Sequence, residues 1–176
     1  MKPFFSVLVL LLTFCSCDKV DELTKFDIDY DTSVVIASAA NINLPFDVVT
    51  PDVETNSESE FAVNDTRKDL IEEIKLKSLR LELASPEDAD FSFLESVEIF
   101  ISAEDLPELQ VATIVEVPMD AGTVIELDTS DDDLKDYIKK NRFSLRLNTV
   151  TDEVLTEDHT IDVKSVFFVD AKILGI

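Results

Sequence analysis

The stretch that decides the fold lies near the C-terminus and reads IDVKSVFFVDAKI over residues 161–173. Its apolar residues recur at every second position, at Ile161, Val163, Phe167, Val169, Ala171 and Ile173. Most positions between them are charged, namely Asp162, Lys164, Asp170 and Lys172. This alternation is the period of a β-strand with one face buried and one face in water. We therefore expect the chain to end in a half-buried strand.

The same period of two recurs throughout the chain upstream of residue 161. The segments that carry it are Phe26–Ile36, Ile42–Val48, Leu79–Leu83, Val97–Ala103, Val111–Val117, Thr123–Leu127 and Phe143–Leu147, with a weaker piece at Phe61–Val63. Pro45 cannot donate a ladder hydrogen bond, which favours an edge strand for the second segment. The sequence thus predicts eight or nine strands.

Two segments favour short helices instead. Asp65 and Thr66 resemble a helix start, and Leu70, Ile71 and Ile74 follow at helical spacing for about two turns. The apolar parity then slips between Leu76 and Leu79, which indicates either the change from helix to strand or a β-bulge.

The second expected helix covers residues 131–140. Ser130 is a favourable N-cap, and Asp133 stands three residues later, where a capping box places an acid. The apolar stripe consists of Leu134, Tyr137 and Ile138. We expect this helix to cover one side of the sheet.

Many short amphipathic strands without a βαβ series predict an all-β fold with one or two short helices. Strands that are polar on one face are typical of antiparallel sheets. We therefore predict an antiparallel two-layer β-sandwich of immunoglobulin-like or jelly-roll type, formed by residues 26–176 as a single domain. Only two glycines are present, so nothing resembles a phosphate-cradling loop, and we expect no bound nucleotide.

The N-terminus carries a second strong signal. Lys2 provides a positive start, FFSVLVLLLTF at 4–14 is an uninterrupted apolar run, and Ser16 directly precedes Cys17. These features describe a secretory signal peptide. A cysteine just after such a run resembles the lipobox of bacterial lipoproteins, although Phe14 stands where the common lipobox has leucine. The resemblance implies that residues 1–16 are removed and that Cys17 carries a diacylglycerol and acyl anchor.

Three other interpretations of this segment are weaker. A transmembrane helix needs about 20 apolar residues, and this run stops at Asp18. Ordinary signal cleavage favours an Ala-x-Ala-like site, which is absent near Cys17. A disulfide between Cys15 and Cys17 would close too small a loop to staple a fold.

Residues 17–25 then form a short tether that holds the folded part close to the membrane. The segment DKVDELTK at 18–25 resembles the surface-export signals of some gram-negative lipoproteins, and a plain solvated linker explains it equally well. We expect attachment to the outer membrane, with the periplasmic and surface faces both open.

The charge of the chain limits its partners. Removal of residues 1–16 takes away Lys2 and leaves 14 basic against 38 acidic residues, a net charge of −24. Nucleic acid requires lysine and arginine to neutralise phosphates, so we expect no nucleic-acid partner. The lipid anchor supplies the membrane contact, and we expect the partner to be a protein of the cell envelope.

Acidic clusters are the only candidates for a metal site. Asp27, Asp29 and Asp31 have the opening spacing of an EF-hand loop, but Thr32 replaces the turn glycine and strand alternation explains the three acids. A loop calcium at Asp128, Asp131 and Asp132 is a weak alternative to helix capping. We expect no resident metal and no cofactor other than the lipid on Cys17.

Catalytic chemistry finds little support in the sequence. The single histidine, His159, stands just before the last strand, and we interpret it as an exposed strand-start residue. A nucleophilic triad or a zinc site needs further ligands or partners that nothing in the sequence singles out. Paired carboxylates for glycoside hydrolysis remain open in so acidic a chain. We therefore expect a protein that is not an enzyme.

Four apolar residues stand on the expected polar faces of their strands: Phe100, Ile114, Val166 and Phe168. Cover by loops or by the helix at 131–140 is one explanation, and a patch that docks a partner protein is the other. The leading hypothesis is a non-catalytic, lipid-anchored binding module of the cell envelope. The alternatives are a carrier that holds a small apolar ligand or lipid between its sheets, and an envelope hydrolase with paired carboxylates.

Overall fold

The computed structural model describes residues 24–38 and 42–172. The signal segment, Cys17 and Ile173 lie outside the described residues. Nine strands and three short helical segments follow one another in this part of the chain. Their bounds are β1 (Lys25–Ile36), β2 (Phe46–Val49), β3 (Val53–Glu54), α3 (Ser57–Val63), β4 (Ile71–Ser85), the 3-10 segment η2 (Phe91–Phe93), β5 (Leu94–Ala103), β6 (Leu109–Ile114), β7 (Val124–Thr129), α4 (Lys135–Ile138), β8 (Arg142–Thr151) and β9 (His159–Ala171).

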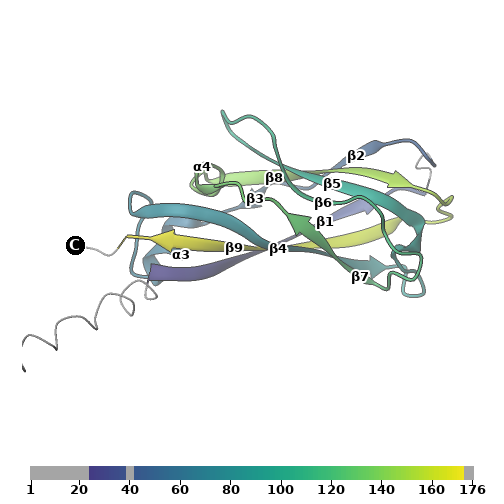
Figure 1. The fold of residues 1–176 in the computed structure, drawn as a ribbon, viewed down its shortest axis with the longest axis horizontal. Helices are drawn as coiled ribbons and strands as arrows, with labels where there is room; N and C mark the ends of the chain where they lie inside the picture. Colours follow the sequence, from purple (N-terminus) through teal and green to yellow (C-terminus); the bar gives the residue numbers. More distant parts are fainter. Residues whose placement is uncertain (1–23, 39–41, 173–176) are drawn as a thin grey trace, which may run out of the picture.

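The strands form a β-sandwich with jelly-roll order. One hydrogen-bonded path runs β1-β9-β4-β7-β6-β5-β8-β2, with β3 also paired to β8, and all strand pairs are antiparallel. The path turns over where β7 meets β6, a junction of only two residue pairs. One layer is therefore β1-β9-β4-β7 and the other is β6-β5-β8-β2 (Figure 1). Successive strands mostly alternate between the layers, which is the double Greek key of a jelly roll.

Aromatic rings join the two layers. Tyr30 of β1 contacts Phe143 of β8 with ring centroids 5.4 Å apart and Phe167 of β9 at 5.7 Å, and Phe143 lies 6.0 Å from Phe167. All three side chains are buried. The hydroxyl of Tyr30 donates to the backbone oxygen of Thr55 at 2.7 Å. Burial, with a smaller contribution from Glu60, raises the pKa of Tyr30 far above its usual value, so the ring stays neutral.

The expected alternation of the last strand is confirmed. In β9 the side chains at odd positions from His159 to Ala171 are buried and those between them are half-buried. β9 pairs with β1 on one side and with β4 on the other. It is thus a central strand, which explains why its pattern is the clearest in the sequence. β2, which follows Pro45, lies at one end of the path, as the proline predicts.

The prediction of the first helix is wrong. Residues 71–85 form the long strand β4, with register shifts between Ile71 and Glu73 and between Leu76 and Ser78. Each shift inserts an extra residue, so buried side chains that share the inner face are three apart in sequence. These bulges produce the helix-like spacing of Ile71, Ile74, Leu76 and Leu79. The parity slip after Leu76 is therefore a β-bulge.

The other helical predictions need two corrections. Phe61–Val63 belongs to helix α3 and not to a strand, because Ser57 and Phe61, one turn apart, share its buried face. The second helix is confined to Lys135–Ile138. Its stripe of Leu134, Tyr137 and Ile138 is buried as expected. Ser130 does not cap it, and Asp133 Oδ1 instead accepts from the backbone nitrogens of Lys135 and of Ile74 in β4, both at 3.1 Å.

Candidate functional site

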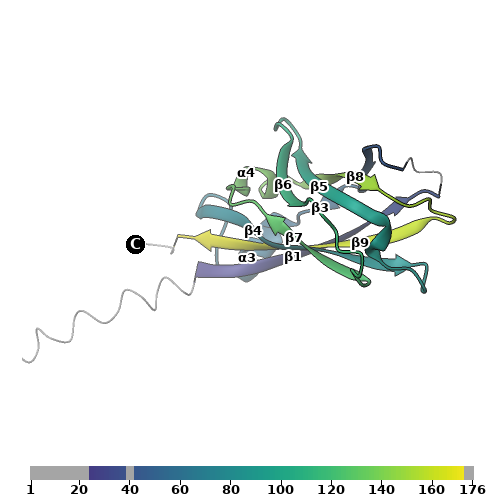
Figure 2. The same ribbon diagram turned by 45° about the vertical axis from the view of Figure 1, so that its right-hand side comes forward.

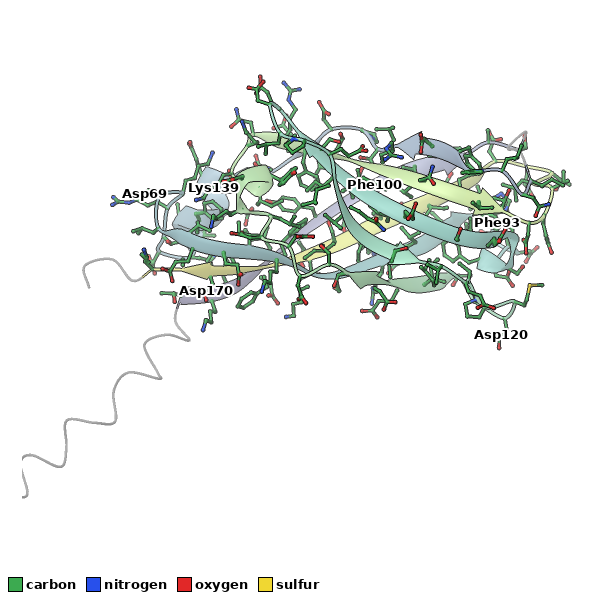
Figure 3. The ribbon with its side chains drawn as sticks, turned by 45° about the horizontal axis from the view of Figure 1, so that its top comes forward. Asp69, Phe93, Phe100, Asp120, Lys139 and Asp170 are labelled. Atoms are coloured by element: carbon green, nitrogen blue, oxygen red, sulfur yellow. The ribbon has the colours of Figure 1, made fainter. Side chains whose placement is uncertain are left out.

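Strand direction divides the sandwich into two ends. β1 begins at Lys25 at one end of the sandwich, so the described residues of the connections β1–β2, β4–β5, β6–β7 and β8–β9 all lie at the opposite, far end. Figure 3 shows this separation, with Phe93 and Asp120 at one end and Asp69, Lys139 and Asp170 at the other. We call the described residues of the four connections, 37–38, 42–45, 86–93, 115–123 and 152–158, the distal loops. They lie at the end of the domain opposite to Lys25, where β1 begins.

The distal loops contain acidic residues but no lysine or arginine. Nine carboxylates occur in them, at Glu87, Asp88, Asp90, Glu116, Asp120, Asp152, Glu153, Glu157 and Asp158. At the opposite end, by contrast, acids are paired with bases, as in Lys68–Glu58 and Lys135–Asp133. The negative charge of the domain is therefore least compensated at its far end.

The same end exposes most of the large aliphatic side chains that face water in the described part of the chain. Those in the distal loops are Ile42, Leu44, Val115, Met119 and Val154, and those in the adjoining strand ends are Val35 and Val124. Elsewhere the described residues expose only Val49 and Val63 in this class. Exposed apolar side chains and uncompensated carboxylates therefore lie at the same end of the domain.

Hydrogen bonds tie the distal loops to one another. Asp158 Oδ1 accepts from the backbone nitrogen of Ser38 at 2.8 Å, and the nitrogen of Phe91 donates to the oxygen of Gly122 at 3.1 Å. The nitrogen of Asp152 donates to the oxygen of Phe93 at 3.1 Å. The hydrogen bond from Ser38 lowers the pKa of Asp158. All four connections are therefore linked by hydrogen bonds, two between backbone groups and one to the side chain of Asp158.

The β4–β5 connection is anchored by η2, whose phenylalanines pack into the core. Asp90 Oδ1 accepts from the nitrogen of Ser92 at 2.9 Å, which caps η2, and these hydrogen bonds lower the pKa of Asp90. Phe91 and Phe93 of η2 are buried in the core. The short helical turn thereby fixes the loop above it, because two large side chains must leave the core before the loop can move.

A hollow of about 400 Å³ lies between the β4–β5 and β8–β9 connections. Four carboxylates line it, from Asp88, Asp90, Glu153 and Glu157, together with apolar atoms of Pro86, Ala89, Phe93, Val154 and Leu155. His159 forms part of its wall. No lysine or arginine lines it. The hollow is thus an acidic depression with an apolar wall.

The prediction for His159 needs a correction. The sequence predicts an exposed residue at the start of the last strand, and it does begin β9, but its exposed fraction is only 6%. Its ring lies 4.6 Å from the ring of Phe93, and Nδ1 is 2.9 Å from the backbone oxygen of Glu157. Because a carbonyl oxygen only accepts, Nδ1 carries a proton and donates to the backbone oxygen of Glu157.

A larger hollow, of about 580 Å³, lies beside α3 at the end where β1 begins. It is lined by both signs of charge, and its basic residues are already engaged, since Lys68 pairs with Glu58 at 3.7 Å and Arg142 with Asp52 at 3.1 Å. A mixed and internally paired surface offers less to a charged partner than the distal loops do. Size alone does not identify the site.

The four apolar residues predicted as a docking patch do not form one patch. Phe100 lies on the outer side of β5, whereas Val166 and Phe168 lie on the outer side of β9 in the other layer. Ile114 faces the core side, because it pairs with the buried Val97 after a register shift between Ile99 and Phe100. That bulge also turns Val115, expected in the core, outward to an exposed fraction of 79%.

Phe100 is covered by a charged cluster rather than by a loop or helix. The guanidinium carbon of Arg146 lies 4.2 Å from the ring centroid of Phe100. Arg146 donates twice to Glu108, at 2.9 and 2.6 Å, and once to Asp47 at 2.6 Å. A hydrogen bond from Arg146 lowers the pKa of Glu108, and bonds from Asn148 and then Arg146 lower that of Asp47. The cluster satisfies its own charges and stabilises the outer face of β8.

Replacement of Arg146 by methionine is expected to lower the free energy of unfolding by about 1 kcal/mol at pH 7, the upper range for surface ion pairs. Carboxyl groups whose pKa is lowered by folding stabilise the protein above their unfolded pKa, near 4, and lose that contribution as the pH falls through the folded value. The difference from wild type should therefore shrink at pH 3. Urea unfolding at both pH values measures it, with Arg67→Met at an exposed pair as the control. If Arg146→Met loses as much unfolding free energy at pH 3 as at pH 7, the ion pairs of Arg146 are not the cause of the loss.

The weak metal candidates are not brought together. Asp128 lies in β7, and Asp131 and Asp132 lie in the irregular segment that leads to α4. Across residues 24–38 and 42–172, no group of three or more histidine, cysteine, aspartate or glutamate side chains is placed to hold a metal ion. Asp27, Asp29 and Asp31 alternate along β1, as strand geometry requires, and Asp27 pairs with Lys77. In the same residues, no helix has the length and apolar character needed to cross a bilayer.

Comparisons with known proteins add little. No protein family model matches the chain. No curated protein matches it either. Among solved structures, a chain of desmodium yellow mottle tymovirus is similar at 13% identity over 86% of this chain and 91% of that chain, with a TM-score of 0.31. The fold assignment rests on the strand order described above.

Proposed function

We propose that this protein is a non-catalytic, lipid-anchored binding module of the cell envelope that presents its distal loops to a partner protein. The observation that carries the proposal is the opposition of the two ends. The chain enters β1 at one end, where Cys17 would hold it to the membrane through a tether of a few residues. The uncompensated carboxylates and exposed aliphatic side chains lie at the other end, which would point away from the bilayer.

A binding role fits the packing better than a carrier role. Large side chains from both layers fill the space between the sheets, among them Leu81 and Phe167 of one layer and Ile99 and Phe143 of the other, each no more than 1% exposed. The hollows described here are surface depressions rather than spaces between the layers. An enzymatic role has less support than binding, because the carboxylates at the distal loops are not paired around a common buried point.

Replacement of Cys17 by alanine tests the anchor. We expect wild-type cells to yield a mature protein that begins at an acylated Cys17, and the variant to accumulate as the longer precursor without incorporated fatty acid. Metabolic labelling with a palmitate analogue, together with mass spectrometry of the N-terminal peptide, measures both. Cys15→Ala is the matched control and should be acylated normally. Acylation that survives the loss of Cys17, or mature wild-type protein without lipid, would contradict the anchor.

Crosslinking on intact cells tests the binding role. The native protein should be recovered with one dominant envelope protein, and that product should be lost or strongly reduced in the Cys17→Ala variant, because the anchor places the distal loops at the partner. Recovery of the lipoprotein alone would count against a binding module. A small apolar molecule that co-purifies with the protein would favour the carrier instead.

A further inference from the structure

We propose that the hollow between the β4–β5 and β8–β9 connections binds a lysine or arginine side chain from a basic, extended segment of the partner protein. This inference rests on the proposed function, since it names the chemistry of the partner at the same distal surface. It draws on two features of the hollow: its uncompensated negative charge and its apolar wall.

The charge of the hollow is uncompensated. Among the described residues, none of Asp88, Asp90, Glu153 and Glu157 is in an ion pair with lysine or arginine. Asp90 also caps η2 by accepting a hydrogen bond from the nitrogen of Ser92. A concave surface lined by one sign of charge concentrates its field and attracts the opposite charge. A cationic side chain is therefore the favoured occupant.

The carboxylates of the hollow are acceptors for a cationic group. An ammonium or guanidinium group is a donor only, so its N–H groups match the carboxylates of Asp88, Glu153 and Glu157. His159 stands in the wall among them, where its ring is 94% buried and its Nδ1 donates to the backbone oxygen of Glu157. Its ring nitrogens therefore report on what occupies the hollow.

The apolar wall fits the stem of a long basic side chain. Phe93 and Leu155 are buried beneath the hollow, and Val154 stands beside it with an exposed fraction of 68%. Lysine and arginine place their methylene groups on apolar surface while the charged head stays with polar partners. A small free cation would use the carboxylates but leave Val154, Met119 and Leu44 in water, so a protein segment uses more of the surface.

The test is a titration of the full chain, purified with its own N-terminus in uncharged detergent, with synthetic peptides. One peptide alternates lysine and valine over nine residues, and a second has glutamine in place of every lysine. The readout is the ¹⁵N resonance of His159 Nε2, which is unambiguous because the chain has a single histidine. The lysine peptide should shift this resonance in a saturable way, and the glutamine peptide should not.

Two variants with the same change in net charge make the test specific. Asp88→Asn/Glu153→Gln/Glu157→Gln alters exposed acids of the hollow, and Asp131→Asn/Asp132→Asn/Asp136→Asn alters exposed acids at the tether end. The first should weaken peptide binding at least tenfold, and the second less than twofold. Equal weakening in both, an unmoved His159 resonance, or lysine amide binding as tightly as the peptide would overturn the inference.

The result also separates this inference from the proposed function. If crosslinking on cells finds an anchored partner but the lysine peptide fails the His159 readout, the basic segment is wrong and the binding module stands. If the peptide binds as expected but no partner is found on cells, the hollow is a cation site and the proposed function fails.

Discussion

Replacement of Phe143 by alanine is expected to lower the free energy of unfolding by about 3–5 kcal/mol, the range for loss of a buried phenylalanine. Phe143 is 1% exposed and contacts Tyr30 and Phe167 of the opposite layer. Its removal leaves a cavity between the two sheets where no neighbouring side chain can fill the space without leaving its own contacts. Urea unfolding of residues 18–176, followed by far-ultraviolet circular dichroism, measures the loss.

Phe168→Ala is the matched control for this prediction. Phe168 is adjacent to the buried Phe167 in β9 but points to the outer face and is only half-buried. Its replacement should cost about 1 kcal/mol, because less apolar area leaves the protein interior. A loss at Phe143 no larger than that at Phe168 would show that the two layers do not pack through these rings.

The second large effect concerns partner capture. Simultaneous replacement of Asp88, Glu153 and Glu157 by lysine is expected to reduce recovery of the crosslinked partner on cells at least tenfold. The reversed charges repel the basic segment that we propose for the hollow, and like charges brought together at an interface cost several kcal/mol. The fold should be intact, because in the structure none of the three side chains makes a hydrogen bond or ion pair among the described residues.

The tether-end triple variant Asp131→Lys/Asp132→Lys/Asp136→Lys separates a local effect from a global one. It changes the net charge by the same amount, yet its residues lie in α4 or in the segment just before it, and α4 is at the opposite end of the sandwich from the distal loops (Figure 2). Its partner recovery should match wild type. Equal loss in both variants would mean that net charge alone governs association.

The strands were predictable from the sequence where one face is buried and the other is exposed to solvent. Side-chain burial alternates without interruption along β1 and β9, as the period of two requires. The sequence left two sandwich types open, because strand order depends on contacts between segments that are far apart in the chain. The pairing of β1 with β9 and of β4 with β7 decides for the jelly roll.

Bulges account for most of the errors. An inserted residue changes the parity of a strand without any marker in composition, and this occurs twice between Ile71 and Ser78 and once beside Phe100. The two bulges in β4 produce an apolar spacing like that of a helix. The bulge beside Phe100 exchanges the faces on which Ile114 and Val115 lie. Helix α4 is shorter than its capping pattern predicts because the Asp133 carboxylate also bonds to β4, a long-range contact that a local motif does not reveal.

The candidate site was largely hidden in the sequence. Its carboxylates are spread over segments 86–93 and 152–158, and only the fold brings these connections to one hollow. A signal was nevertheless present: every segment between the predicted strands that forms a distal loop lacks lysine and arginine. His159 was judged by its polar neighbours in sequence, whereas the ring of Phe93 and the β4–β5 connection bury it.

The most direct test of the central claim is crosslinking from defined positions on intact cells. A photoreactive amino acid is placed either at Val154, in the distal loops, or at Val63, at the tether end, two valines with similar exposed fractions of 68% and 76%. The account predicts a discrete protein adduct from position 154 and none, beyond lipid, from position 63. An adduct of the same protein from position 63, with position 154 silent, would contradict it.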